Sequence, residues 1–161
     1  MAKLHHILGM NARNLHYLNL NNHKARDIAD SKLLTKKILR KYKIPHPKLI
    51  KTLRSFSDVR KFDWLSLSGG FVLKPSEGYG GEGILVIKKN TDQEGKWFLM
   101  NGHVITEEDL KLHAMDILEG SYSRNRTPDQ AFIEQRVKIH PKFGKYAHQG
   151  TPDVRVIVYN S

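Results

Sequence analysis

The sequence predicts an α+β fold in which a small antiparallel sheet forms a lobe of its own, accompanied by helices. Three observations lead to this prediction. Short runs rich in β-branched and aromatic residues follow one another in the middle of the chain. Two of these runs are separated by Asn101-Gly102, a strong signal for a two-residue hairpin turn. Other stretches combine helix caps with a helical spacing of apolar residues.

A helix is predicted to begin after Asp30 or Ser31, since either residue can cap it, and to stop at Pro45. Residues 1–29, which precede it, are rich in Asn and His and predict only a short helix followed by irregular chain. The apolar face of the predicted helix comprises Leu33, Leu34, Ile38 and Tyr42, and its cationic face comprises Lys32, Lys36, Lys37, Arg40 and Lys41.

Two further helices are predicted from their cap residues. Ser57 is expected to cap a short helix over residues 58–65. Thr106 is followed three residues later by Asp109, which is a capping-box pattern and predicts a longer helix. Gly120 is expected to end that helix, because glycine readily adopts the left-handed conformation of a helix C-terminus.

The strands are predicted between glycine and polar breaks, among them Gly69-Gly70 and a polar loop over residues 121–130. Trp64 and Trp97 are expected to pack in the core. The predicted strands are Lys48–Lys51, Phe71–Leu73, Gly83–Ile87, Trp97–Met100, His103–Ile105, Ala131–Ile133 and Asp153–Tyr159.

Composition excludes several classes of protein. The 161 residues suffice for one ordinary domain or two small lobes. The chain has no Cys, which excludes a disulfide framework and any thiolate metal site. Its nine His residues show no metal-ligand spacing. No apolar run approaches the roughly 20 residues that span a bilayer, and the first residues lack the apolar core of a signal peptide. We therefore expect a cytoplasmic protein without a membrane partner.

The chain is strongly basic, with a formal net charge of +11. Such a charge attracts polyanions, whether nucleic acid, anionic lipid or nucleoside phosphates. It can equally reflect general solubility, because the lysines are scattered and no block of five or six like charges marks a nucleic-acid-binding tail.

The stretch FVLKPSEGYGGEGILVIKK, Phe71 to Lys89, contains the pattern G-x-G-x-x-G. A dinucleotide-binding loop requires a helix after the last glycine, whereas Ile84–Ile87 is a strand pattern. A Walker loop requires G-K-[S/T] at its end, which is absent. A strand–loop–strand flap remains, whose backbone N–H groups can fold over phosphates. Lys74 precedes the loop and can reach such a phosphate. The alternative is a mobile surface hairpin with an ordinary lysine.

Several motifs, in this order, resemble the ATP-grasp ligases, and within them the alpha-L-glutamate ligase-like group, also called sugar-transfer-associated ATP-grasp. RimK-type alpha-L-glutamate ligases and D-alanine–D-alanine ligases are more distant relatives of that group. The matching pieces are Gly9–Asn14, Asp30–Lys36 followed by Ile44-Pro45-His46-Pro47, the lysine strand and flap over Phe71–Ile87, Phe132–Val137, and Gln149–Tyr159 with its D-x-R pattern.

The resemblance implies roles for individual residues in binding ATP. Lys32 and Lys74 match the two phosphate-contacting lysines, and Ser76, Gly80 and Gly81 would donate to the phosphates from the flap. Two lysines from separate elements together with backbone donors suit a triphosphate, whose charge spreads over several oxygens.

The resemblance also implies a hinge that holds adenine, formed by Glu134, Gln135, Arg136 and Val137. Backbone groups would read the adenine edge, and Glu134 would accept from its amino group. Glu134 could instead pair with a nearby cation. Arg155, on the D-x-R strand, is the expected catalytic residue and would meet a phosphate or the acyl group of the substrate. It could instead form an ion pair with Asp153 or Glu134.

The implied fold is a truncated ATP-grasp fold with a small antiparallel-sheet lid lobe. The expected segments are an N-terminal helical segment over 1–56, a lid lobe with the glycine-rich flap over 57–135, and the start of a C-terminal subdomain over 136–161. ATP and Mg²⁺ are the expected cofactors, but the family places its magnesium carboxylates after the D-x-R strand. We therefore expect no metal ligand within this chain.

The implied function is the ATP-binding portion of an ATP-dependent carboxylate–amine ligase that acts through an acylphosphate. Its carboxylate and amine substrates are unknown, with glutamate as one candidate. Two alternatives stay open at this point. One is a basic nucleic-acid-binding module. The sequence argues against this alternative, because its aromatic residues are not interleaved with the basic clusters. The other is a non-catalytic ATP-grasp fragment that serves as a partner surface.

Overall fold

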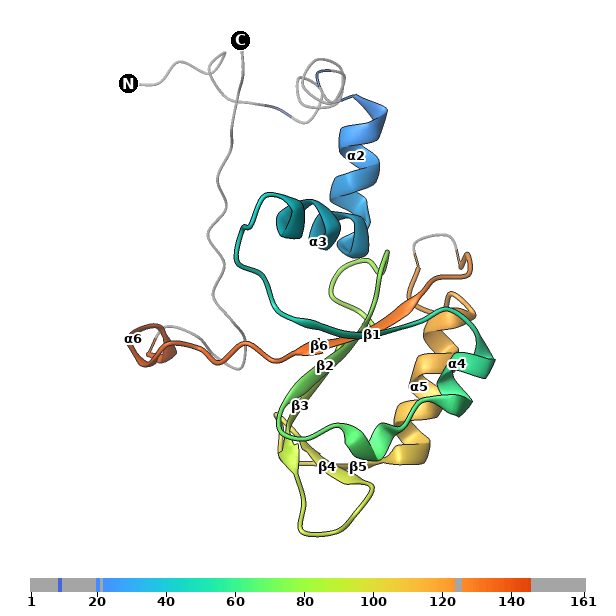
Figure 1. Cartoon of the computed structure of the whole chain (residues 1–161), viewed down its shortest axis with the longest axis vertical. Coiled ribbons are helices and arrows are strands. Elements are labelled where there is room, and N and C mark those ends of the chain that lie inside the picture. The colour runs from blue at the N-terminus through green and yellow to red at the C-terminus, as the bar shows by residue number, and fades with distance from the viewer. Residues whose placement is uncertain (1–8, 10–19, 21, 124–125, 146–161) are drawn as a thin grey trace. The chain divides into compact units, whose positions relative to one another are not determined.

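A computed structural model describes residues 9, 20, 22–123 and 126–145 of the chain (Figure 1). The chain divides into two compact units, Met1–His46 and Pro47–Ser161. The division into segments 1–56, 57–135 and 136–161 stays a prediction. The predicted strand Asp153–Tyr159 and most of the Gly9–Asn14 motif lie outside the described residues.

The described part of the first unit is a pair of packed helices, α2 (His23–Asp30) and α3 (Lys32–Lys41). Ser31 caps α3, because its hydroxyl accepts from the N–H of Leu34, and Asp30 is instead the last residue of α2. The Thr35 hydroxyl donates to the Ile28 carbonyl at 2.6 Å and ties the two helices together. The helix ends before Pro45 because Lys43 adopts a positive φ of 56°.

Exposure along α3 does not follow the division into an apolar and a cationic face. Lys36, on the cationic face, is only 9% exposed. Leu34 and Tyr42, on the apolar face, are 43% and 64% exposed. Helical spacing identifies which residues share a face, but not how exposed each of them is.

The described part of the second unit is a six-stranded antiparallel sheet with helices on one face (Figure 1). Helix α5 packs against β2, β5 and β6, and α4 packs against β1 and α5. The order in the sheet is β1-β6-β2-β3-β4-β5. The strands are β1 (Leu49–Leu53), β2 (Phe71–Pro75), β3 (Leu85–Asn90), β4 (Lys96–Leu99), β5 (Val104–Thr106) and β6 (Ala131–Gln135). The helices are α4 (Phe56–Lys61), the 3₁₀ helix η4 (Trp64–Ser66), α5 (Glu107–Leu118) and α6 (Pro141–Gly144).

The fold class and most elements agree with the predictions, and the differences have local causes. Helix α4 begins earlier than predicted because Ser55, not Ser57, is its cap, with the Asp58 carboxylate accepting from the N–H of Ser55. Strand β3 begins two residues after Gly83, because that glycine has a φ of +71° and completes a turn. The capping box of Thr106 and Asp109 opens α5 as predicted.

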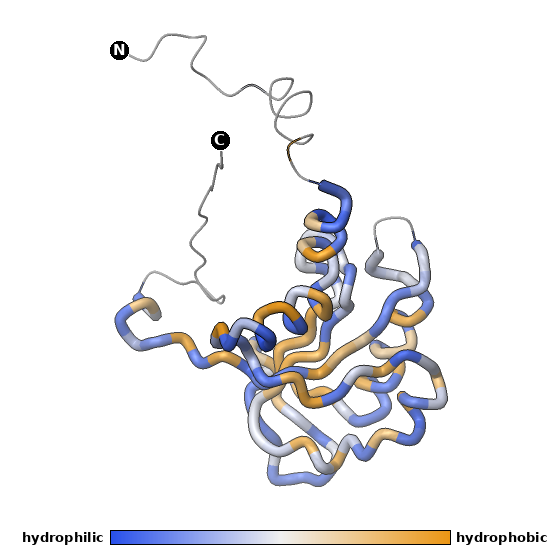
Figure 2. The backbone as a smooth tube through the Cα atoms, turned by 45° about the horizontal axis from the view of Figure 1, so that its top comes forward, coloured by the Kyte–Doolittle hydropathy of each residue, from blue (hydrophilic) through white to orange (hydrophobic). Residues whose placement is uncertain are grey.

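The core lies between the sheet and α5. Trp64 and Trp97 are each 1% exposed, so both pack in the core as expected. Figure 2 shows that hydrophobic stretches concentrate in the middle of this unit, with hydrophilic residues along many of its loops. The fully buried side chains include Leu53, Val59, Leu73, Ile87, Leu110, Ala114, Ile117, Ala131 and Ile133. Among the described helices, none combines the length and the apolar character that crossing a membrane requires.

Candidate functional site

The sheet face opposite α5 carries the lysine that the sequence singles out. In the pairing of β2 with β6, Val72 lies opposite Glu134 and Lys74 lies opposite Phe132. Paired residues of antiparallel strands share a face, as do residues two apart along one strand. These four side chains therefore lie together, while Leu73 and its neighbours point into the core on the other face.

Lys74 is held on this face by two partners. Its ammonium nitrogen lies 2.5 Å from the Oε1 atom of Glu134 and 5.3 Å from the centre of the Phe132 ring. The Glu134 side chain is only 5% exposed, and that of Lys74 is 20% exposed. Solvent screens a partly buried ion pair only weakly, so the carboxylate of Glu134 holds the ammonium group of Lys74 in position. The lysine side chain nevertheless stays partly accessible to solvent.

The glycine loop begins directly after β2 and places backbone donors at its tip. Gly80 and Gly81 have positive φ angles of 63° and 83°, and at neither position would a Cβ come within 4 Å of another group. In the described part of the chain, neither of their N–H groups donates a hydrogen bond to the protein. Successive donors left free in such a conformation can bind an anion. Ser76 at the start of the loop is 3% exposed, and its N–H donates to the Gln130 carbonyl.

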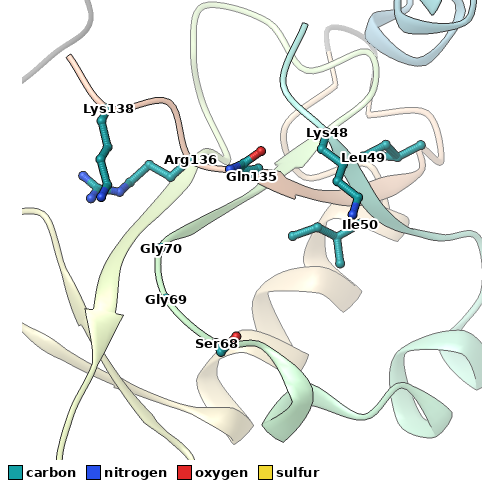
Figure 3. Close-up of a pocket in the computed structure, with 9 residues that line it drawn as sticks. All are labelled: Lys48, Leu49, Ile50, Ser68, Gly69, Gly70, Gln135, Arg136 and Lys138. Atoms are coloured by element: carbon teal, nitrogen blue, oxygen red, sulfur yellow. The ribbon is translucent and has the colours of Figure 1, made fainter. Parts of the chain in front are cut away.

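A pocket of about 540 Å³ lies at the end of the sheet where β6 ends and β2 begins (Figure 3). Among the described residues that line it, the charged ones are all cations. In Figure 3 the side chains of Arg136 and Lys138 extend toward the same side of the pocket. The residues that line it are Lys48, Leu49, Ile50, Ser68, Gly69, Gly70, Gln135, Arg136 and Lys138.

Arg136 passes directly over Gly70, the residue that precedes β2, and only glycine permits this path. A Cβ on residue 70 would lie 2.6 Å from the Arg136 Nε atom and 2.9 Å from the Lys88 carbonyl oxygen. The N–H of Arg136 donates to the Gly70 carbonyl, and its guanidinium reaches the Met100 sulfur at 3.4 Å. The Nε atom is buried without a hydrogen-bond partner among the described residues. These contacts hold the arginine beside the start of β2, where it lines the pocket.

The structure brings most of the predicted site residues into the second unit. Lys74, Ser76, Gly80 and Gly81 lie along the end of β2 and the loop, and Glu134 to Val137 form the end of β6 and the residues that follow it. Lys32 belongs to the first unit, as the first residue of α3. Arg155 lies outside the described residues. The contact of any of these residues with ATP stays a prediction.

Sequence reasoning misses the residues that hold the loop. The side chains of His113 and Tyr122 contact Gly83, and the Asp129 carboxylate accepts from the N–H of Glu77 at 2.9 Å. The sequence predicts only a polar loop for the segment that carries Tyr122 and Asp129.

In the sequence, Gly120 is the residue that could have indicated that this segment packs back against the end of α5. Its φ of +85° and its lack of a side chain make room for the Thr127 carbonyl to pack against it. A glycine in that position serves the returning loop as well as the helix end.

The described residues contain no group of three or more His, Cys, Asp or Glu side chains that could hold a metal ion.

Comparison with known protein families gives a match over nearly the whole chain. A family model described as sugar-transfer associated ATP-grasp matches residues 11–161. This match confirms the resemblance noted from the motifs and agrees with the mixed helix and antiparallel-sheet fold. No protein of curated function and no solved structure matches the chain.

Proposed function

The chain belongs to the sugar-transfer associated ATP-grasp family, and on this premise we propose that it is the ATP-binding portion of an ATP-dependent carboxylate–amine ligase. The family supports an ATP-binding module of the ligase type. The finer assignment, a glutamate ligase-like enzyme that forms an acylphosphate, is our proposal.

One arrangement carries the proposal. A lysine fixed by Glu134 on a sheet face is followed, within a few residues, by a loop tip with free N–H donors in the described part of the chain. A charged donor and neutral backbone donors at neighbouring positions match a polyphosphate, which offers many acceptor oxygens along one chain. The cationic pocket at the hinge adds positive potential to the same sheet. In this proposal Glu134 to Val137 meet the adenine, and Lys74, Gly80 and Gly81 meet the phosphates. Ser76 would join them through its hydroxyl, because its N–H donates to the Gln130 carbonyl.

The proposed chemistry has two steps. A carboxylate oxygen attacks the γ-phosphorus, the bond from that phosphorus to the β–γ bridging oxygen breaks, and ADP leaves with the electron pair. The amine nitrogen of the second substrate then attacks the acyl carbon, inorganic phosphate leaves, and the nitrogen releases a proton. The acylphosphate must be shielded from water between the steps, which a glycine loop over the phosphates would provide. Lys74 and the loop donors would stabilise charge on the transferred phosphoryl group.

Nucleotide binding is the first test. Isothermal titration calorimetry of the full chain should show saturable binding of Mg-ATP and weaker binding of Mg-GTP. Fluorescence anisotropy with a short RNA and a short DNA, at two salt concentrations, measures the affinity for nucleic acid that the alternative function requires. Tight nucleic-acid binding that falls steeply with salt and is not displaced by ATP, together with no saturable ATP binding, would contradict the proposal in favour of a nucleic-acid-binding module.

Acylphosphate formation is the second test. Hydroxylamine traps acylphosphates as hydroxamates, so an intact family member that also carries the magnesium carboxylates is incubated with Mg-ATP, hydroxylamine and carboxylates that include glutamate. With that protein and a true substrate, hydroxamate and ADP should form in equal amounts. ATP binding without hydroxamate from any carboxylate would favour a non-catalytic ATP-grasp module.

A further inference from the structure

We propose that His113 and Tyr122 are positioning residues for the glycine loop, which they fasten at Gly83 so that only the tip around Gly80 and Gly81 is left to move. The loop's role over the phosphates rests on the proposed function. The fastening itself rests on contacts within the second unit.

The Tyr122 ring is the first fastening point. A Cβ on residue 83 would lie 2.6 Å from the Cγ atom of Tyr122, which is far inside van der Waals contact. The φ of Gly83 is also positive, at 71°. The ring therefore packs directly on the glycine backbone, and any larger residue at position 83 would have to displace it.

His113, on α5, is the second fastening point. Its Nε2 atom lies 2.9 Å from the Gly83 carbonyl oxygen. A carbonyl oxygen can only accept, so Nε2 must carry the hydrogen of this bond. In the neutral ring, Nδ1 is then an acceptor, and it faces the Tyr122 hydroxyl at 3.3 Å. Tyr122 thus holds the histidine ring, and the histidine ring holds the end of the loop.

The segment that carries Tyr122 also fastens the beginning of the loop. The Tyr122 carbonyl accepts from the N–H of Tyr79 at 3.3 Å. The Gln130 carbonyl accepts from the N–H of Ser76, and the Asp129 carboxylate accepts from the N–H of Glu77, each at 2.9 Å. The first arm of the loop is therefore bound to the segment that follows α5, and the second arm is bound to that segment and to α5.

The tip differs from both arms. Gly80 and Gly81 are exposed, and a Cβ at either position would have open space around it to at least 4 Å. In the described part of the chain their N–H groups make no hydrogen bond to the protein. A loop with fixed arms loses little conformational entropy when it closes, so more of the interaction energy with the ligand contributes to affinity. The arms would then set where the free donors point, and the tip would adapt to the phosphates.

Hydrogen exchange of the full chain without nucleotide tests the fastening directly. With fragmentation that resolves single amides, the N–H groups of Ser76, Glu77 and Tyr79 should exchange at least tenfold more slowly than those of Gly80 and Gly81. The arms should be protected because their N–H groups are hydrogen-bonded, whereas those of the tip are not.

Substitution of His113 tests its own contribution to the fastening. His113→Leu should raise exchange at Tyr79 and around Gly83 at least several-fold. His113→Gln, whose amide can still donate to the Gly83 carbonyl, should restore most of the protection. Unchanged exchange in β6 reports that each variant is folded.

Tyr122→Phe is a milder change, because it removes only the hydroxyl that holds the His113 ring. It should raise exchange around Gly83 by less than His113→Leu does. If neither Tyr122→Phe nor His113→Leu alters exchange in the loop, the fastening is wrong.

A matched pair of glycine substitutions separates steric contact from backbone strain. Gly83→Ala and Gly102→Ala both force alanine into a positive φ, of 71° and 88° respectively, but a Cβ on residue 102 would have no neighbour within 4 Å. Gly83→Ala should therefore weaken Mg-ATP binding at least tenfold, and Gly102→Ala should not change it. The double variant of Gly83→Ala with Tyr122→Ala should bind no worse than Tyr122→Ala alone.

The two proposals fail in different ways. If the wild-type chain binds no ATP, the proposed function is overturned. Faster loop exchange in His113→Leu would still support the fastening in that case. Equal protection of arms and tip in the wild type would overturn the fastening whether or not ATP binds. Mg-ATP that protects Gly80 and Gly81 without changing the arms would support both.

Discussion

Lys74 and Glu134 meet on one face of the sheet, 2.5 Å apart, although they belong to strands far apart in the chain. The pair lies diagonally across β2 and β6, so it depends on the register of the two strands. The lysine's charge is thereby balanced by a carboxylate that is nearly buried, while the lysine itself stays partly open to solvent. A phosphate that approached would share this lysine with Glu134.

Removal of the Lys74 charge should weaken Mg-ATP binding. A charge-assisted hydrogen bond contributes about 1.5–3 kcal/mol, so Lys74→Met should raise the Kd for Mg-ATP by a factor of about ten or more. Lys89→Met is the matched control, because it removes the same charge from an exposed residue of β3. Calorimetry on both variants makes the measurement. A change of less than about threefold for Lys74→Met would rule out the phosphate contact.

Two substitutions of Glu134 distinguish its two possible partners. Glu134→Gln keeps an oxygen acceptor, whereas Glu134→Met removes it. If Glu134 accepts from the adenine amino group, Glu134→Met should lose the preference for Mg-ATP over Mg-GTP and Glu134→Gln should keep most of it. Competition between the two nucleotides gives the ratio. Equal ratios in both variants and the wild type would show that Glu134 serves only to pair with Lys74.

Gly70 should be essential for the path of Arg136 over the start of β2. Gly70→Ala forces a methyl group against the guanidinium and the Lys88 carbonyl, and overpacking of this kind costs about 1–3 kcal/mol in the free energy of unfolding. Part of that loss should disappear when Gly70→Ala is made in an Arg136→Ala background. Urea unfolding of the two single variants and the double variant measures the coupling. Additive effects, within about 0.5 kcal/mol, would show that the arginine does not lie over residue 70.

The capping box of α5 should make part of the stability depend on pH. The Thr106 side chain and backbone hydrogen bonds hold the pKa of Asp109 below its ordinary value of 3.8. A carboxyl with a lower pKa in the folded state adds stability above its unfolded pKa, and this stability is lost as the pH falls through the folded value. The difference in Tm between the wild type and Asp109→Asn should therefore be constant from about pH 7 to pH 5 and shrink below about pH 4. A difference that stays undiminished as the pH falls further would contradict the assignment.

Local signals account for the part of the fold that the sequence predicts. The capping box of Thr106 and Asp109 and the helix end at Gly120 each act within a few residues, and the structure confirms both. The Asn101-Gly102 signal places a hairpin correctly, but the loop has three residues rather than two. The N–H of Leu99 donates to the His103 carbonyl, Phe98 pairs with Val104, and Gly102 has a φ of +88°. The start of α4 is predicted too late because Ser55 and Ser57 are both plausible caps. The reach of the Asp58 carboxylate back to the N–H group of Ser55 decides between them.

Non-local contacts account for what the sequence does not predict. Lys74 and Glu134 each stand out in the sequence, but their pairing requires the register of two strands far apart in the chain. The contact of His113 with Gly83 spans 30 positions and follows from how α5 packs on the sheet.

The order of strands has a consequence for how the sheet is assembled during synthesis. Strands β2 to β5 are neighbours both in the sequence and in the sheet, so they can pair as each leaves the ribosome. Strand β1 is made before them, yet in the described sheet its partner is β6, which is made after them. Strand β1 therefore has no partner in the described sheet until β6 has been synthesised and pairs between β1 and β2. Tryptic cleavage at Lys51 should be rapid in nascent chains stalled before β6 has emerged and slow in chains stalled after it. Equal cleavage in both would show that another part of the nascent chain protects β1 from the protease before β6 pairs with it.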